Sequence, residues 1–142
     1  MKGTGLIILL CVFILTSFHS ADSMIKYELV FEAKGCHYQI SVNDKLLTEG
    51  KSYQKIVKTL EINESLTDSG EQKIDVKMIR ISREMPLKTT QAYVNLKLEK
   101  ISGDSSILIK EVKLPTFPYD EDEDQPHSIG GSIEFEVKPQ TE

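Results

Sequence analysis

The side chains best able to do chemistry gather in one acidic run near the end of the chain. Between Pro118 and Pro126 the sequence reads Tyr-Asp-Glu-Asp-Glu-Asp-Gln. Carboxylates at alternate positions, here Asp120, Asp122 and Asp124, can lie on one side of a segment and bind calcium through their oxygens. The run lacks the glycine and the distant bidentate glutamate of the Asp-x-Asp-x-Asp-Gly calcium loop, so calcium is the weaker interpretation and no metal is predicted.

The same run, with the aromatic residues beside it, favours contact with a basic protein partner. Aromatic side chains anchor protein interfaces, and neighbouring charges steer a surface of opposite sign toward them. The predicted partner-binding residues are Phe117, Tyr119, Asp120, Glu121, Asp122, Glu123 and Asp124. The simpler alternative is a solvated acidic loop that only aids solubility.

Cys36 and His37 are adjacent and raise the question of a thiolate nucleophile. Thiolate formation needs a helix N-terminus or a basic cluster that lowers the pKa of the thiol. The sequence around Cys36 provides neither. We therefore expect Cys36 to be a small buried hydrophobic residue at the start of a strand.

Known catalytic motifs are absent from the sequence. It has no Gly-x-Ser-x-Gly, no His-Glu-x-x-His and no cysteine pair with metal-ligand spacing. His37 and His127 lie far apart with no motif between them, and His19 belongs to the N-terminal segment. The chain is therefore predicted not to be an enzyme and to need no cofactor.

Residues 1–23 are typical of an export signal. Lys2 is a short basic start, and an uninterrupted apolar run from Leu6 to Leu15 follows it. That run is shorter than the roughly 20 residues of a membrane-spanning helix, so cleavage is favoured over an anchor. A small-x-small site ends at Ser23, and a cut after Ala21 is the alternative. We expect an exported protein, periplasmic or extracellular, with no membrane contact after cleavage.

Charge and composition narrow the choice of partner. The chain has 17 Lys and Arg against 22 Asp and Glu, a net charge of −5. Loss of residues 1–23 removes Lys2 and Asp22 together, which leaves that net charge unchanged. An acidic protein is a poor match for nucleic acid or anionic lipid, and the absence of tryptophan weakens the case for stacking on sugars. We expect a monomer, in which Cys36 alone can form no internal disulfide.

Alternation of apolar and polar residues predicts strands along most of the remaining chain. The expected strands are 25–33, 38–42, 53–62, 72–81, 92–98, 107–114 and 133–137. With no long amphipathic helix, the pattern indicates an all-β domain, an antiparallel β-sandwich (jelly-roll or Ig-like) of about seven or eight strands. The domain should cover residues 24–138 and precede a polar tail at 139–142. An open barrel is the alternative.

Turn-forming residues predict how the second strand connects to the third. Asn43 and Asp44 tolerate left-handed backbone, so they indicate a tight turn. After it, Leu46 and Leu47 should return to the core. Gly50-Lys51-Ser52 is expected to be the next loop.

Three further features of the connections are expected. Residues 63–70 should form a short helical turn whose Leu66 plugs one end of the core. A shift of apolar phase within 107–114 predicts a β-bulge. The run Met78-Ile79-Arg80-Ile81 suggests a twist or bulge near the end of its strand.

Part of the sequence resembles a known class of proteins. The residues that carry the likeness are Ser41-Val42-Asn43-Asp44, Leu60-Glu61-Ile62-Asn63, Leu66 and Ser69-Gly70-Glu71-Gln72-Lys73-Ile74. They resemble small bacterial exported β-sandwich proteins of jelly-roll, galactose-binding-like type, many of them uncharacterised. The resemblance implies structural roles in turns and strands, and some members of the class bind carbohydrate. The chain departs from the pattern at Asp44, where glycine is usual, and at Gln72, where asparagine is usual.

These observations predict an exported, non-catalytic binding or interaction protein of the periplasm or cell surface. Its contact with a basic protein partner would lie in the acidic run 117–124. The alternative is a carbohydrate-binding or calcium-dependent β-sandwich module. In either case the stretch 41–81 would specify the fold and not the activity.

Overall fold

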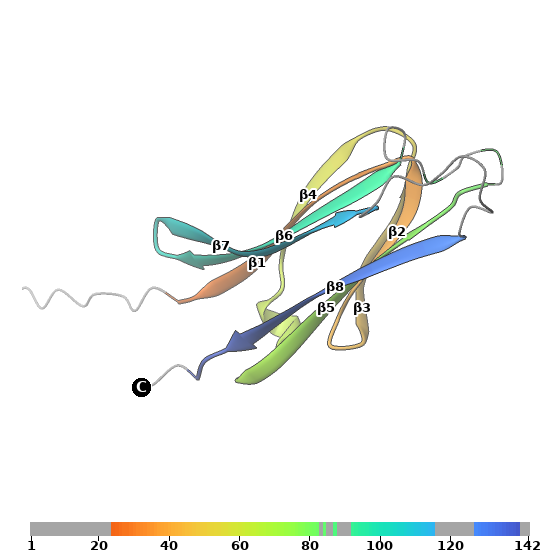
Figure 1. Cartoon of the computed structure of the whole chain (residues 1–142). Coiled ribbons are helices and arrows are strands. Elements are labelled where there is room, and N and C mark those ends of the chain that lie inside the picture. The colour runs from red at the N-terminus through yellow and green to blue at the C-terminus, as the bar shows by residue number, and fades with distance from the viewer. Residues whose placement is uncertain (1–23, 83, 85–86, 88–91, 116–126, 140–142) are drawn as a thin grey trace, which may run out of the picture.

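The structure, a computed structural model, describes residues 24–82, 84, 87, 92–115 and 127–139. These residues form eight β-strands and one short 3₁₀-helix, which confirms the predicted all-β class (Figure 1). The elements are β1 (Lys26–Lys34), β2 (Cys36–Val42), β3 (Lys45–Ser52), β4 (Ile56–Glu61), η1 (Asn63–Ser65), β5 (Gly70–Ile79), β6 (Tyr93–Ser102), β7 (Ser105–Leu114) and β8 (Ser128–Val137).

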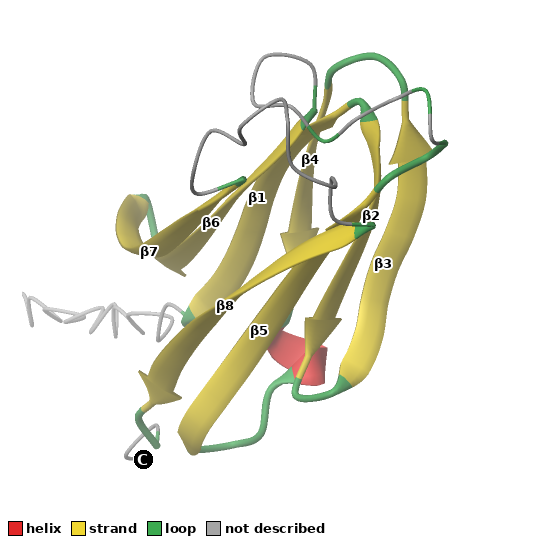
Figure 2. Cartoon of the chain, turned by 45° about the vertical axis from the view of Figure 1, so that its right-hand side comes forward, coloured by secondary structure: helices red, strands yellow, loops and turns green. Residues whose placement is uncertain are grey.

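Two antiparallel four-stranded sheets face each other in a sandwich, as predicted (Figure 2). Sheet A has the strand order β4-β1-β6-β7, and sheet B has the order β3-β2-β5-β8. The hairpins β2–β3 and β6–β7 stay within one sheet, whereas the other successive connections pass from one sheet to the other. Strands β4 and β7 are therefore the edges of sheet A, and β3 and β8 are the edges of sheet B.

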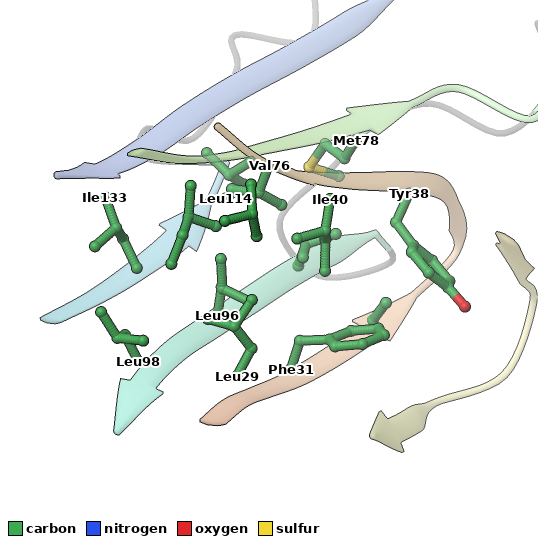
Figure 3. Close-up of a cluster of buried hydrophobic side chains, with 14 of the residues drawn as sticks. Leu29, Phe31, Tyr38, Ile40, Val76, Met78, Leu96, Leu98, Leu114 and Ile133 are labelled. Atoms are coloured by element: carbon green, nitrogen blue, oxygen red, sulfur yellow. The ribbon is translucent and has the colours of Figure 1, made fainter. Parts of the chain in front are cut away.

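The core lies between the sheets and is built by alternate residues of the strands (Figure 3). β1 and β2 alternate buried and partly exposed positions, because one side of each strand faces the opposite sheet. Phe31 of β1 and Tyr38 of β2 join the two sheets through rings whose centroids are 5.2 Å apart. The buried residues labelled in Figure 3 are Leu29, Phe31, Tyr38, Ile40, Val76, Met78, Leu96, Leu98, Leu114 and Ile133.

The predicted turn at Asn43-Asp44 is confirmed. Their φ angles are 48° and 66°, in the left-handed region that Asn and Asp enter more readily than other non-glycine residues. Asn43 also contacts β5, since its backbone N–H donates to Lys73 O at 2.8 Å and its Oδ1 accepts from the Lys73 N–H at 2.9 Å. The turn is thus attached to the neighbouring strand of sheet B.

Gln72 links this turn to the segment that precedes β5. Its side chain is buried, with 1% of the residue exposed. Oε1 accepts from Asn43 Nδ2 at 2.7 Å and from the Thr67 N–H at 3.0 Å. Nε2 donates to Thr67 Oγ1 and to Gly70 O. The amide is satisfied on both sides, as a buried polar group requires.

The short helical turn expected after β4 is confirmed as η1, and Leu66 packs against the core beside it. The side chain of Asn63 continues the pairing of β4 with β1. Its Oδ1 accepts from the Tyr27 N–H at 2.7 Å, and its Nδ2 donates to Ile25 O at 2.9 Å. The amide of Asn63 therefore takes the place of one more backbone pair at this end of sheet A.

The prediction that both leucines after the turn enter the core is wrong for Leu46. Leu46 is 56% exposed, whereas Leu47 packs against the core. The reason is a register shift, since Ile40 pairs with Thr48 but Ser41 pairs with Leu46. Leu47 is the extra residue of a bulge, and such a residue changes which side chains face inward.

One expected break in the strands is also wrong. Gly50-Lys51-Ser52 is not a loop but the last part of β3, where Gly50 pairs with Tyr38. A Cβ at Gly50 would lie 2.6 Å from Tyr38 Oη, so the glycine makes room for the tyrosine. Of the twist or bulge expected over 78–81, a bulge is absent from the paired part, because β5 pairs with β2 and β8 without a shift as far as Ile79.

The predicted bulge in β7 is confirmed at Ile109. Leu98 pairs with Lys110 and Glu99 pairs with Leu108, so Ile109 has no residue opposite it on β6. A bulge locally bends and twists the strand that carries it. Beyond it, Val112 and Leu114 face the core side of the strand.

The side of the sandwich where β7 and β8 meet is tightly packed at Gly131. A Cβ there would lie 2.9 Å from Val112 Cγ1 and 3.3 Å from Leu114 Cδ2, closer than the roughly 3.5–4.0 Å of a good carbon contact. The adjacent Gly130 faces outward, and a Cβ there would have Val76 O as its nearest neighbour at 3.6 Å. Of these two adjacent glycines, Gly131 is the one that depends on lacking a side chain.

We predict that Gly131→Val lowers the free energy of unfolding by about 1–3 kcal/mol, because valine would overpack the contact with Val112. Gly130→Val is the matched control and should leave stability near the wild-type value, since its side chain enters solvent. Denaturant unfolding of both variants measures the difference. Equal losses at the two positions would contradict the close approach at Gly131.

Candidate functional site

The acidic run predicted to bind a partner lies outside the described residues. Phe117, Tyr119 and the carboxylates 120–124 all fall within 116–126. The described residues on either side are Pro115, after the end of β7, and His127, whose carbonyl accepts a hydrogen bond from the Arg80 N–H at 2.9 Å. Partner or calcium binding by this run stays a prediction.

Cys36 and His37 do not form a catalytic pair. Cys36 is fully buried, and burial raises the pKa of its thiol to about 11. The alternation of β2 turns His37 to the opposite face, where its Nε2 lies 3.9 Å from a Glu49 carboxylate oxygen. A neutral, enclosed thiol is not a nucleophile near pH 7. The expectation that Cys36 is a buried hydrophobic residue is confirmed.

Three glutamates form a row across the outer face of sheet A. Glu28 lies opposite Glu61 on β4 and opposite Glu99 on β6. Two contacts partly offset the repulsion between these carboxylates. Lys26 Nζ lies 3.3 Å from a Glu61 carboxylate oxygen, and Ser106 Oγ donates to Glu99 at 3.2 Å. Among the residues that the structure describes, no three His, Cys, Asp or Glu side chains group closely enough to hold a metal ion. The row is therefore a local electrostatic cost and not a metal centre.

A groove of about 560 Å³ opens at the end of the sandwich where β1 begins and β8 ends. It is lined by Ile25, Tyr27, Asn63, Leu66, Thr67, Asp68, Ser69, Val137, Lys138 and Pro139. The Asn63 amide already bonds to β1, and Thr67 already bonds to Gln72. The Asn63 and Thr67 side chains are thus used within the fold, and the other polar side chains of the lining are those of Asp68, Ser69 and Lys138.

A second polar cluster lies on the outer face of sheet A. Tyr93 Oη donates to Glu32 Oε1 at 2.5 Å, and Lys55 Nζ lies 3.1 Å from Glu32 Oε2. The Tyr93 hydrogen bond, followed by the Lys55 contact, holds the pKa of Glu32 below its ordinary value. The same bond is the main reason that the pKa of Tyr93 is raised. Both carboxylate oxygens are engaged, so Glu32 is not poised to act as a general base.

Exposed apolar side chains are concentrated on the edge strand β7. Ile107, Leu108 and Ile109 are consecutive and are 58%, 51% and 36% exposed. We call these three residues the β7 strip. Other large exposed apolar residues, such as Leu46 and Val57, are isolated on different strands. Contiguous exposed apolar surface on a folded protein marks a contact site more often than scattered residues do.

The edge position gives the β7 strip a second property. An edge strand presents backbone N–H and C=O groups that its own sheet does not pair, and proteins usually guard such edges with charges, bulges or short strands. Every edge strand carries charged residues, listed here by strand: Lys45, Glu49 and Lys51 on β3, Lys58 and Glu61 on β4, Lys110, Glu111 and Lys113 on β7, and Glu134 and Glu136 on β8. On β7 the charges all follow the bulge, so the run from Ser105 to Ile109 carries none, and it is the uncharged edge run that exposes three large aliphatic side chains.

Comparison with known proteins found no match among protein-family models, curated proteins or solved structures. The likeness of residues 41–74 to bacterial exported sandwiches therefore stays a resemblance. Within the described part of the chain, no helix is long and apolar enough to cross a membrane. The candidate site has to be judged on its own geometry.

The β7 strip was not among the sites predicted from the sequence. The apolar phase of 107–114 groups Ile107 and Ile109 with positions that form the core. The available signal was the run of three consecutive aliphatic residues, because a strand with one buried face cannot turn adjacent side chains inward together. That run indicated exposed apolar surface before the strand order was known.

We predict that Cys36 resists DTNB near pH 8 in the folded chain and reacts fully in guanidinium chloride, because burial keeps its thiol protonated and enclosed. The test uses Cys11→Ser so that only Cys36 reports. Since the folded-state pKa of Cys36 is raised to about 11, the thiol's contribution to stability is present below the unfolded pKa of about 8.5 and is lost as the pH rises above it. Cys36→Ala should abolish this alkaline loss. Rapid labelling of the folded chain would contradict the burial of Cys36.

We also predict that Glu28→Lys stabilises the domain by a few tenths to about 1 kcal/mol, because it replaces two like-charge pairs with two opposite-charge pairs. The gain should shrink in concentrated salt, which screens exposed charges. Glu134→Lys is the control of opposite sign, since Glu134 lies opposite Lys73 and its replacement creates a like-charge pair. Thermal unfolding of both variants tests this prediction. A loss of stability in Glu28→Lys would contradict the repulsion inferred for the row of glutamates.

Proposed function

We propose that this chain is an exported, non-catalytic binding protein that contacts another protein by strand addition to the β7 edge. The observation that carries the proposal is the β7 strip, three consecutive exposed aliphatic residues on an edge strand. Export is supported by the sequence of residues 1–23. A non-catalytic role is supported by the engaged or enclosed state of the polar groups at Cys36 and Glu32.

In strand addition, an extended segment of the partner pairs with the free backbone groups of an edge strand. The added strand would lie about 4.7–4.9 Å from β7, so its side chains would cover those of the strip on both faces of sheet A. Main-chain hydrogen bonds would supply the pairing. The aliphatic side chains would select an apolar, uncharged segment.

The expected affinity is modest. Full burial of an aliphatic side chain contributes about 1.5–3 kcal/mol, and the strip residues are already partly covered. Covering all three would therefore yield on the order of 3 kcal/mol before the entropic cost of association. Such a contact suits a reversible interaction.

Protein contact is preferred to the carbohydrate or calcium module for a specific reason. Oriented polar groups and a stacking surface are what a sugar site requires, and at the sandwich end the Asn63 and Thr67 groups bond within the fold. Among the described residues, the contiguous exposed apolar surface that no intramolecular contact explains is the β7 strip. Apolar edge surface matches a protein strand better than it matches a sugar or an ion.

The proposal predicts a position-dependent contact in the cells that make this protein. A photo-crosslinking residue in place of Leu108 should form a covalent adduct with another protein chain. The same residue in place of Leu46, which is similarly exposed on the edge strand β3, should not. Adding Ile107→Lys should abolish the adduct at position 108 because a charge would enter the apolar contact.

Two controls make this result interpretable. Ile107 is exposed, so Ile107→Lys should change the free energy of unfolding by no more than about 0.5 kcal/mol. Denaturant unfolding of the variant checks this directly. Equal adducts at positions 46 and 108, or none at 108, would refute the β7 edge as the contact surface.

A further inference from the structure

We infer that the outer face of sheet A binds a small aliphatic monocarboxylate in a hollow between Asn95 and the ammonium groups of Lys97 and Lys113. This site is separate from the β7 strip, so the inference goes beyond the proposed function and does not rest on it. The shape of the face, the polar groups left free on it and the charges beside it carry the inference.

The hollow follows from the register of the strands. Residues that face outward from sheet A line up across it in rows, because opposite residues of paired strands lie on the same side. Val30 is shorter than its neighbours Glu32 and Lys97, so it forms the floor of a hollow of about 250 Å³. The lining residues are Val30, Glu32, Val57, Asn95, Lys97 and Lys113.

A second hollow adjoins the first toward the end of β7. It also measures about 250 Å³, and Tyr93 and Pro115 are among its lining residues. Both hollows include Asn95 and Lys113, which lie opposite each other on β6 and β7. The amide of Asn95 therefore sits at the centre of one continuous depression in the face.

The acceptors in this depression are already engaged. Both oxygens of Glu32 have partners, Oε1 with the Tyr93 hydroxyl and Oε2 with Lys55 Nζ. The proton of the Tyr93 hydroxyl is used in the same contact. A ligand that needed a carboxylate acceptor, such as a metal ion or an ammonium group, would have to displace these contacts.

The donors, in contrast, remain free. Among the residues that the structure describes, the Asn95 amide forms no side-chain hydrogen bond, and Lys97 acts on Glu32 as a nearby charge without an ion pair. Lys113 Nζ lies 3.6 Å from a Glu111 carboxylate oxygen, but both side chains of that pair are exposed, so the contact is weak. Two ammonium groups and one amide thus face the same small space.

A carboxylate suits these donors because each of its oxygens can accept from an ammonium or an amide group, and hydrogen bonds between charged groups are the stronger ones. Apolar contact is offered beside them by Val30 on the floor and by Val57, which is 58% exposed. Burying such surface favours an aliphatic body over a hydroxylated one. The ligand class is therefore a short, branched aliphatic acid.

The glutamate row limits this ligand to one negative charge. Glu99 follows Lys97 two positions along β6 and so shares its face, and Glu28 lies opposite Glu99. A second carboxylate on the ligand would lie close to this row, well within the screening length of about 10 Å at moderate salt. Like-charge repulsion should therefore exclude polyanions from the hollow.

A ¹H–¹⁵N NMR titration of the chain with sodium isobutyrate at constant ionic strength tests the site. The signals of the Asn95 side-chain amide should shift and saturate, with a dissociation constant on the order of 10 mM. Isobutyramide, which has the same shape without the charge, should cause no saturable shift. Glucuronate, whose body is hydroxylated, should bind about threefold more weakly, and citrate should not bind.

Three variants identify the groups responsible. Lys97→Met keeps an unbranched side chain but removes the ammonium, and it should weaken isobutyrate binding about fivefold. Lys77→Met is the matched control, since Lys77 is an exposed lysine on a central strand of sheet B, and it should leave binding unchanged. Glu99→Gln retains an acceptor for Ser106 Oγ and should make citrate binding measurable. The spectrum of each variant reports whether it is folded.

Each result supports or overturns a defined part of the inference. An absent or unsaturable shift at Asn95, or equal losses in Lys97→Met and Lys77→Met, overturns the site. Isobutyramide binding as tight as isobutyrate overturns the role of the carboxylate, and tighter binding of glucuronate or citrate overturns the ligand class. Citrate that stays unbound in Glu99→Gln overturns exclusion by the glutamates. The position-108 adduct tests the proposed function separately, because Leu108 does not line the hollow.

Discussion

The buried amide of Gln72 is the interaction on which the arrangement of the sandwich depends. It joins three segments that are separate in the sequence: the β2–β3 turn at Asn43, the segment at Thr67 and the start of β5. Leaving one of its groups buried without a partner would cost about 1–3 kcal/mol. The amide is therefore stably buried only when all three segments are in place around it. The residues that carry the resemblance to bacterial exported sandwiches lie around this contact. In this chain their types are explained by the turns and hydrogen bonds that they make.

The fold was predictable wherever one face of a strand is buried, because alternation is then imposed on the sequence. Alternation identified β1, β2 and β6 and most of their core residues. The extra residues that form β-bulges were harder to locate from the sequence. The bulge at Ile109 shifts the apolar phase and could be predicted, whereas the bulge at Leu47 is masked, since Leu46 and Leu47 fit either face. Gly50 looked like a loop because its contact with the Tyr38 ring is a tertiary property.

The candidate site was less predictable than the fold for a related reason. Whether a strand is central or at an edge depends on strand order, which local sequence does not encode. Ile107 on a central strand would be an ordinary core residue, but on β7 it is exposed. The acidic run attracts attention in the sequence because its charges are visible without any fold. Exposed apolar surface can be recognised only when the fold shows which apolar residues are buried in the core.

The outer face of sheet A explains why contact at β7 should take place through the edge and not through the face. Across β4, β1 and β6 that face carries the glutamate row centred on Glu28 and the Glu32–Lys55 pair. A partner packed flat on it would have to desolvate these charges, and burying charge is costly unless it is paired. The row ends where Glu99 faces Leu108, an exposed aliphatic residue of the edge strand. A strand added at the edge covers the aliphatic part and leaves the charged part in water, so the charge pattern of the face and the apolar edge favour the same mode of contact.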